Sequence, residues 1–268
     1  MFKFILSFIM ICSYINPNLS HAKELHFFLN ENHVIQVNIK ESELAAFLNN
    51  ITITIKNTDK NLVVFQDDVI PLEFVVKKIG SQQFFFYSTH SGGESGGYIT
   101  LRYLTLDKNG EILNRLLEES PANFEFIDID KDGKEEILTQ DMRFEWFELE
   151  KDCEIISFYF RYFDVPAYFF PKIYSYENHS FVNNTFKFKS YLQKHYLYSI
   201  EKMLLEENEE QNYLTGFIQY FYVSAKLGQG NQALSFIKKH NKPYTDCQGI
   251  NSTVFDLIQN NQDKILKP

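Results

Sequence analysis

The sequence predicts an α+β fold, an antiparallel β-rich body followed by a C-terminal helical segment. From Glu24 to Thr139, short runs of β-branched and aromatic residues alternate with clusters of Asn, Asp, Gly and Lys. After about Ser190 the apolar residues recur with helical spacing instead. No long helical pattern separates the predicted strands, so we expect neighbouring strands to pair antiparallel.

The strand segment divides at its polar clusters. Ile51–Ile55 alternates apolar and polar residues, as a half-buried strand does. Asn109 and Gly110 predict a hairpin turn, and Ser42–Leu48 predicts a short helix with Ser42 as its N-cap. The predicted strands are Leu25–Leu29, Val34–Ile39, Ile51–Ile55, Leu62–Phe65, Leu72–Val76, Phe84–Tyr87 and Tyr98–Leu106.

Two further patterns extend the prediction to the end of the chain. Ile173–Tyr176 and Ser180–Val182 predict a hairpin that turns at Glu177-Asn178-His179. Four helices are expected beyond it, and their positions are approximately Tyr191–Leu204, Tyr213–Leu227, Asn231–His240 and Thr253–Ile265.

Residues 1–22 have the layout of a secretory signal peptide. Lys3 precedes an apolar run from Phe4 to about Ile15, and small residues follow at Ser20 and Ala22. We expect cleavage near Ala22. The predicted organisation is therefore a signal peptide (1–22), a β-rich domain (23–187) and a helical C-terminal segment (188–268).

Two alternatives remain for this first segment, an uncleaved anchor and a lipoprotein acylated at Cys12. The apolar run is shorter than the ~20 residues that a transmembrane helix needs. Since no other stretch is apolar enough, we expect no membrane span in the mature chain and a periplasmic or secreted location.

The charge balance excludes two broad classes of protein. The 268 residues carry 26 Lys+Arg against 35 Asp+Glu, a formal net charge of −9, and 44% of them are hydrophobic. Such a chain is too apolar for disorder. It is also too acidic for non-specific nucleic-acid binding. Cleavage removes one lysine and no acid, so the mature charge becomes −10.

Cleavage also removes Cys12 and leaves Cys153 and Cys247. In an oxidising compartment these two residues are candidates for one disulfide that ties the middle of the chain to its tail. The alternative, two buried free thiols, stays open, because the sequence does not show whether their Cβ atoms meet.

An acidic loop is the strongest chemical signal. Residues 128–136 follow the pattern D-x-D-x-D-G-x-x-E, with carboxylates at alternate positions and Gly133 at the turn. Calcium takes six to eight oxygen ligands, and a bound cation would offset the repulsion among these acids. The predicted calcium ligands are the side chains of Asp128, Asp130, Asp132 and Glu136 and the backbone carbonyl of Lys134.

This loop is not an EF-hand. Thr139 occupies the position of the bidentate Glu, and the flanking residues predict strands rather than helices. The loop resembles the calcium loops of FG-GAP and VCBS-type repeats, which join two strands and take their last acid at the position of Glu136. The resemblance covers about 15 residues and implies a structural calcium.

A wider similarity connects the chain to uncharacterised secreted bacterial proteins. It rests on Ser91-Gly92-Gly93, the acidic loop, Asp141–Phe144 and Ile173–Tyr176. Those proteins often have a Cys pair after the Ser-Gly-Gly, which this chain lacks. The similarity implies no activity.

A glycine-rich segment suggests an alternative function, a serine hydrolase. Gly93-Glu94-Ser95-Gly96-Gly97 satisfies G-x-S-x-G, the pattern of a hydrolase nucleophile. A strand pattern follows Ser95, however, where a nucleophile elbow needs a helix. The simpler reading is a strand connection, and its possible ligand-binding residues are Ser91, Gly93, Ser95 and Gly97.

The remaining composition favours no other class of enzyme. The six mature histidines show no paired spacing, so a zinc enzyme is not expected. Aromatic residues make up 16% of the chain and suggest carbohydrate binding. They rise together with Asn, Ile and Lys, which is typical of an AT-rich genome.

We therefore expect an exported, non-enzymatic, calcium-stabilised module that binds an unknown macromolecule, protein or glycan. The alternatives are a serine hydrolase that uses Ser95 and an inhibitor of a secreted enzyme such as a lysozyme.

Overall fold

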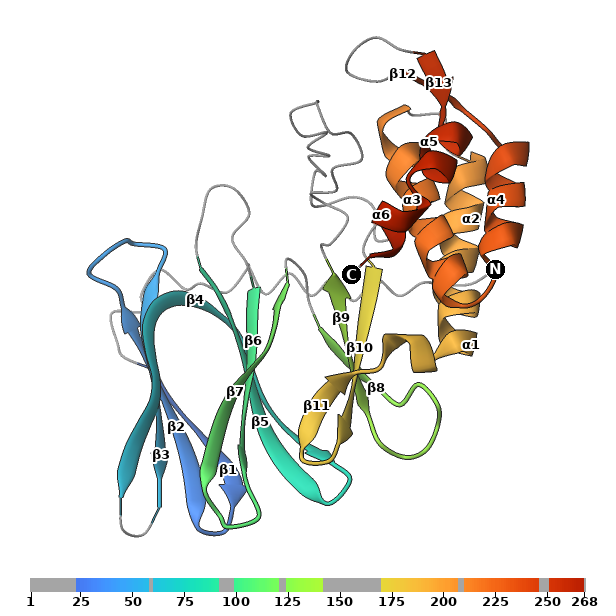
Figure 1. Ribbon diagram of the computed structural model, residues 1–268. Helices are drawn as coiled ribbons and strands as arrows, with labels where there is room; N and C mark the ends of the chain where they lie inside the picture. Colours follow the sequence, from blue (N-terminus) through green and yellow to red (C-terminus); the bar gives the residue numbers. More distant parts are fainter. Residues whose placement is uncertain are drawn as a thin grey trace, which may run out of the picture.

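The computed structural model describes most of the chain as strands and helices (Figure 1). The described residues are 23–57, 60–91, 99–120, 124–141, 170–206, 210–245 and 251–267.

A seven-stranded antiparallel sheet makes up the first part. Its strands lie side by side in chain order, each hydrogen-bonded to the strand before it and the strand after it. The strands are β1 (Lys23–Asn30), β2 (His33–Glu41), β3 (Asn49–Lys56), β4 (Asn61–Ile79), β5 (Gln82–His90), β6 (Ile99–Leu106) and β7 (Ile112–Ser120).

Strand β4 folds this sheet over on itself. It is 19 residues long; its first half pairs with β3 and its second half with β5, and the register slips between Pro71 and Glu73. Proline donates no hydrogen bond to a ladder, so it belongs at such an irregularity. The bend at the top of β4 (Figure 1) brings β1 against β5 and closes an apolar core that includes Ile35, Ile53 and Phe85.

Strand β5 is buried on both faces. Phe84, Phe85, Phe86 and Tyr87 are all 0% exposed. Successive side chains of a strand point to opposite faces, so Phe85 and Tyr87 enter the first core, while Phe84 and Phe86 enter a second core against another sheet.

That second sheet has four antiparallel strands in the order β11-β10-β9-β8. The strands are β8 (Glu125–Ile127), β9 (Glu136–Asp141), β10 (Phe170–Glu177) and β11 (Ser180–Asn183). Phe126 and Phe181 meet Phe86 edge-on, with ring centroids 4.9 and 5.7 Å apart. Aromatic packing between the layers thus places β8 and β9, and the acidic loop between them, against the first sheet.

The helices lie over one end of the four-stranded sheet (Figure 1). Phe170, 1% exposed at the start of β10, packs against Tyr196 and Tyr222 and joins sheet and helices. The elements are η3 (Thr185–Lys187), α1 (Lys189–Tyr191), the π-helix η4 (Leu192–Leu197), α2 (Tyr198–Glu206), α3 (Glu210–Lys226), α4 (Gly230–Lys239), β12 (Pro243–Thr245), β13 (Asn251–Thr253), α5 (Val254–Asn260) and α6 (Gln262–Leu266).

The fold is therefore β-rich α+β, with helices after the strands, as the sequence predicts. The hairpin turn at Gly110 is confirmed: its φ is 81°, and Asp107 Oδ1 accepts hydrogen bonds from the backbone N–H groups of Asn109 and Glu111. The hairpin of β10 and β11 turns at Asn178 and His179, both with positive φ.

Two predictions are wrong. Leu62–Phe65 and Leu72–Val76 are not separate strands, because both belong to the bent β4. Ser42–Leu48 is a loop of bends and turns, not a helix. Ser42 Oγ accepts the N–H of Leu44, and the N–H of Ser42 donates to the carbonyl of Leu48, so the segment closes on itself. Within the described residues, no helix combines the length and the apolar character that a membrane crossing requires.

Candidate metal centre

The acidic loop connects two strands. Strands β8 and β9 pair antiparallel, and Ile127 lies opposite Glu136 at the mouth of the loop. The backbone then curls tightly, with φ of 64° at Lys131 and 86° at Gly133. The second value lies in the left-handed region that favours glycine, which explains why glycine follows the third acid.

Three carboxylates converge inside this curl. Asp128, Asp130 and Glu136 each offer an oxygen atom, and these oxygen atoms all lie within 4.8 Å of one another. A cation with ligand distances of about 2.3–2.6 Å can contact oxygens spaced in this way. The structure therefore brings together three of the four predicted carboxylate ligands.

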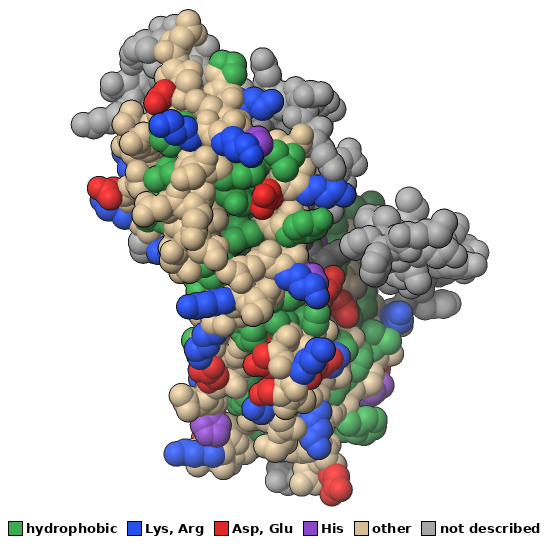
Figure 2. Space-filling view, turned by 90° about the vertical axis from the view of Figure 1, so that its right-hand side faces the viewer, with side chains coloured by type: hydrophobic (Ala, Val, Ile, Leu, Met, Phe, Trp, Pro, Cys, Tyr) green, Lys and Arg blue, Asp and Glu red, His purple; other side chains and the backbone are tan. Residues whose placement is uncertain are grey.

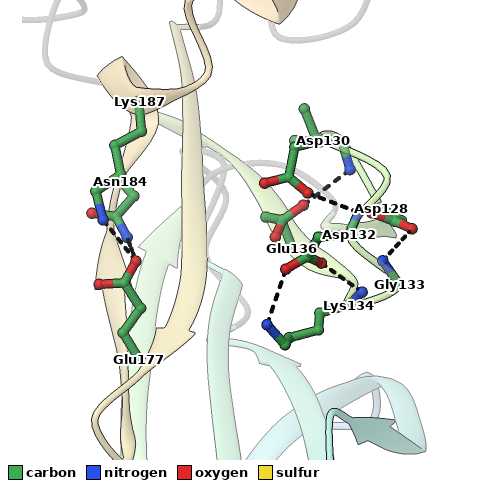
Figure 3. A network of polar contacts seen from close by, with 10 residues as sticks. Asp128, Asp130, Asp132, Gly133, Lys134, Glu136, Glu177, Asn184 and Lys187 are labelled. Carbon is green, nitrogen blue, oxygen red and sulfur yellow. Dashed lines mark hydrogen bonds and ion pairs between the residues drawn. The ribbon is translucent and has the colours of Figure 1, made fainter.

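Backbone N–H groups of the loop hold each of these carboxylates by one oxygen (Figure 3). Gly133 donates to Asp128 Oδ2 at 3.1 Å, Asp132 donates to Asp130 Oδ1 at 3.1 Å, and Ile129 donates to Glu136 Oε2 at 2.9 Å. Asp128 Oδ1 is buried and has no hydrogen-bond partner. A buried carboxylate oxygen without a partner destabilises the fold. A metal ion bound in the loop would give this oxygen a partner, so the loop fits a cation.

Asp132 is not among the three converging carboxylates, and both of its oxygens bond to Lys134. Its Oδ1 accepts the backbone N–H of Lys134 at 2.8 Å, and its Oδ2 pairs with Lys134 Nζ at 3.0 Å. This contact lowers the pKa of Asp132, chiefly through the Lys134 side chain. The predicted roles of the Asp132 side chain and the Lys134 carbonyl as ligands stay predictions.

Glu136 lies in an environment that disfavours its charged form. The residue is 4% exposed. Burial raises the pKa of its carboxyl group, the hydrogen bond from Ile129 opposes this effect, and the charges of Asp130, Asp132 and Asp128 raise the pKa further. A divalent cation would offset these effects, because a nearby opposite charge favours the ionised form.

The neighbouring Glu135 belongs to a different contact. Both of its carboxylate oxygens lie 2.9 Å from Lys77 Nζ on β4. The same ammonium group lies 4.7 Å from the centre of the Phe126 ring. Glu135 thus fastens the loop to the first sheet, and its carboxylate is not among the three that converge.

A cleft that the sequence does not predict borders the loop. Its volume is about 680 Å³, and its lining joins the loop to residues 175–177 of β10 and to residues 187–195. In Figure 3, Lys187, Asn184 and Glu177 lie on one side and the acidic loop on the other. Glu136 and Ser175, the nearest lining residues of the two sides, are 39 positions apart along the chain, so no local pattern could have joined them.

Several predicted residues lie outside the described part of the chain: Gly93, Ser95 and Gly97 of the glycine-rich segment, and both Cys153 and Cys247. The signal peptide and residues 142–144 of the wider similarity also lie outside it. Ser91 is described and exposed just after β5. The hydrolase, disulfide and export hypotheses stay predictions.

No protein-family model, no curated protein and no solved structure matches this chain. The FG-GAP and VCBS resemblance of the loop accordingly stays a prediction.

Proposed function

We propose that loop 128–136 binds one calcium ion and that the protein is an exported, non-enzymatic binding module whose second sheet the ion stabilises. The observation that carries the proposal is the convergence of Asp128, Asp130 and Glu136 around the buried, unpartnered Oδ1 of Asp128.

The donor chemistry favours calcium over other metals. The converging groups are all carboxylates, and hard oxygen ligands suit Ca²⁺ or Mg²⁺ rather than zinc or copper. Mg²⁺ keeps most of its water and needs near-ideal octahedral geometry. Several carboxylates on a curled loop fit the larger, more tolerant Ca²⁺.

The position of the loop gives the ion a structural role. Strand β8 has three residues and pairs only with β9 in the described part of the sheet, so its register depends on the loop that joins them. Without a cation, the loop must hold several like charges close together. Metal binding and the ordering of this hairpin are therefore coupled.

Thermal unfolding with calcium and with EGTA tests the proposal. At about 100 times its Kd, a ligand adds about 2.7 kcal/mol to the free energy of unfolding. For a chain of this size, that corresponds to a rise in Tm of about 5–10 °C. Elemental analysis should find one calcium per chain after purification in calcium.

The matched variants are Glu136→Gln and Glu43→Gln. Glu43 is an exposed acid in a loop far from the metal centre in sequence. The Glu136 variant should lose the calcium-dependent rise in Tm, and the Glu43 variant should keep it. An unchanged Tm in wild-type protein, together with no bound metal, contradicts the proposal.

A further inference from the structure

We propose that the cleft beside the metal centre binds an acidic sugar, whose carboxylate contacts the bound calcium and the lysines of the opposite wall. This inference names the ligand class of the proposed binding module and rests on the calcium site proposed above.

The size and lining of the cleft fit a small polar ligand. Its volume of about 680 Å³ lies within the range of about 300–1,000 Å³ that is usual for small-molecule sites. Ten of its lining residues are charged, five acidic and five lysine. Acidic and basic side chains lie intermingled on this face, below the helices (Figure 2). Such a lining does not suit an apolar ligand.

The acidic wall contains the metal centre itself. Asp130 and Glu136 both converge on the candidate ion and line the cleft. Three carboxylates and one carbonyl would leave calcium short of its six to eight oxygens. A ligand that enters the cleft can complete the shell with carboxylate or hydroxyl oxygens.

The opposite wall supplies three lysines, of which only Lys187 pairs with an acid in the described residues. Lys187 pairs with Glu177 at 2.7 Å. Lys189 and Lys194 are exposed, and neither forms an ion pair with an acid in the described ranges. The π-helix η4 buries Leu192, Tyr196 and Leu197, and leaves Lys194 on the cleft. Short π-helical segments of this kind often occur at functional sites.

Bound calcium would reverse the sign of the formal net charge of the cleft. The five acids and five lysines of the lining cancel, and Asp128 behind them adds one negative charge. A bound Ca²⁺ turns this formal charge of −1 into +1. The cleft should therefore attract an anion when calcium is present and repel it when calcium is absent.

An aromatic platform favours a sugar over an acidic peptide. Tyr191 is half-buried in the lining and stacks on His195, with ring centroids 4.8 Å apart. A pyranose ring can pack its C–H face on such a ring. The hydroxyl side chains of Ser175 and Ser190 also line the cleft and can hydrogen-bond to sugar hydroxyls.

Calorimetric titration of the full mature chain with trigalacturonate tests the inference. Binding in calcium is expected, with Kd weakened at least about tenfold in EGTA and at least about tenfold in Lys189→Ala/Lys194→Ala. The control Lys40→Ala/Lys60→Ala removes two exposed lysines outside the cleft and should bind as wild type does. Both double variants should keep the calcium-dependent rise in Tm.

Neutral galactotriose and triglutamate separate the ligand classes. Equal binding of galactotriose overturns the role of the carboxylate, and tighter binding of triglutamate overturns the choice of a sugar. No binding of trigalacturonate while calcium still raises Tm overturns this inference and leaves the proposed calcium function standing. Trigalacturonate binding by a chain that binds no calcium contradicts both.

Discussion

The seven-stranded sheet and the β8–β9 hairpin differ in what stabilises them. The sheet bends at β4 and encloses an apolar core in which Ile35, Ile53 and Phe85 are 0% exposed. The hairpin places Asp128, Asp130 and Glu136 at its turn instead. Burial stabilises the first without any ligand, whereas the second carries charges that require a partner. The comparison predicts that one molecule has a calcium-independent region and a calcium-dependent region.

The largest expected loss of stability comes from a substitution in the core of the seven-stranded sheet. Phe85→Ala should lower the free energy of unfolding by about 3–5 kcal/mol, because it removes a fully buried ring. That ring lies between Phe27 and Tyr87, with centroids 5.0 and 5.9 Å away. Urea unfolding measures the loss. Phe85→Leu should cost less than Phe85→Ala, because it leaves a smaller cavity.

The same measurement sharpens the comparison when it is repeated in calcium and in EGTA. The cost of Phe85→Ala should be nearly equal in both, because Phe85 packs in the first core and shares no contact with the metal centre, and sites without shared partners add. If the loss of unfolding free energy in Phe85→Ala depended strongly on calcium, the two regions would be energetically coupled.

A smaller effect is expected at the metal centre. Asp128→Asn should remove the calcium-dependent gain, about 2–3 kcal/mol at saturating calcium, because it neutralises the carboxylate with the buried, unpartnered oxygen. Hydrogen exchange locates the change: calcium should slow exchange at β9 amides in wild type and not in the variant. Exchange at β5 should respond far less, and an equal response at β5 would contradict the two-region reading.

The smallest effect concerns the cleft wall. Lys187 donates a hydrogen bond to the exposed Glu177 and holds the pKa of that carboxyl below its usual range. A lowered folded-state pKa stabilises the protein above the unfolded pKa, and this contribution is lost as pH falls through the folded pKa. In Lys187→Met, the NMR-measured pKa of Glu177 should rise toward its usual value. Because both groups are exposed, overall stability should change little. An unchanged pKa would show that the pair does not persist in solution.

Local patterns predicted the parts of this fold that depend on neighbours in sequence. Ile51–Ile55 alternates because one face is buried, and its three isoleucines are 0–1% exposed. The acidic loop and its flanking strands were readable because ligand spacing and turn chemistry lie within a few residues.

The remainder depended on contacts between distant segments. The run Phe84–Tyr87 predicts a strand, but nothing local shows that two different sheets cover its faces. Ser42–Leu48 has the composition of a helix and closes instead through the hydrogen bond between Ser42 and Leu48. The cleft forms where residues 187–195 lie beside the loop. Sequence periodicity cannot predict this contact, because the two segments are far apart in the chain.

The chain-order pairing of the seven strands has a consequence for folding. Each strand finds its partner in the segment made just before it, so the loops that must close are short and the contacts are local. The sheet can therefore form one strand at a time, from β1 to β7, while the chain is being synthesised. At every stage the newest strand presents an unpaired edge, which invites association with other chains until the next strand covers it. The growing sheet is thus most vulnerable to aggregation at its advancing edge.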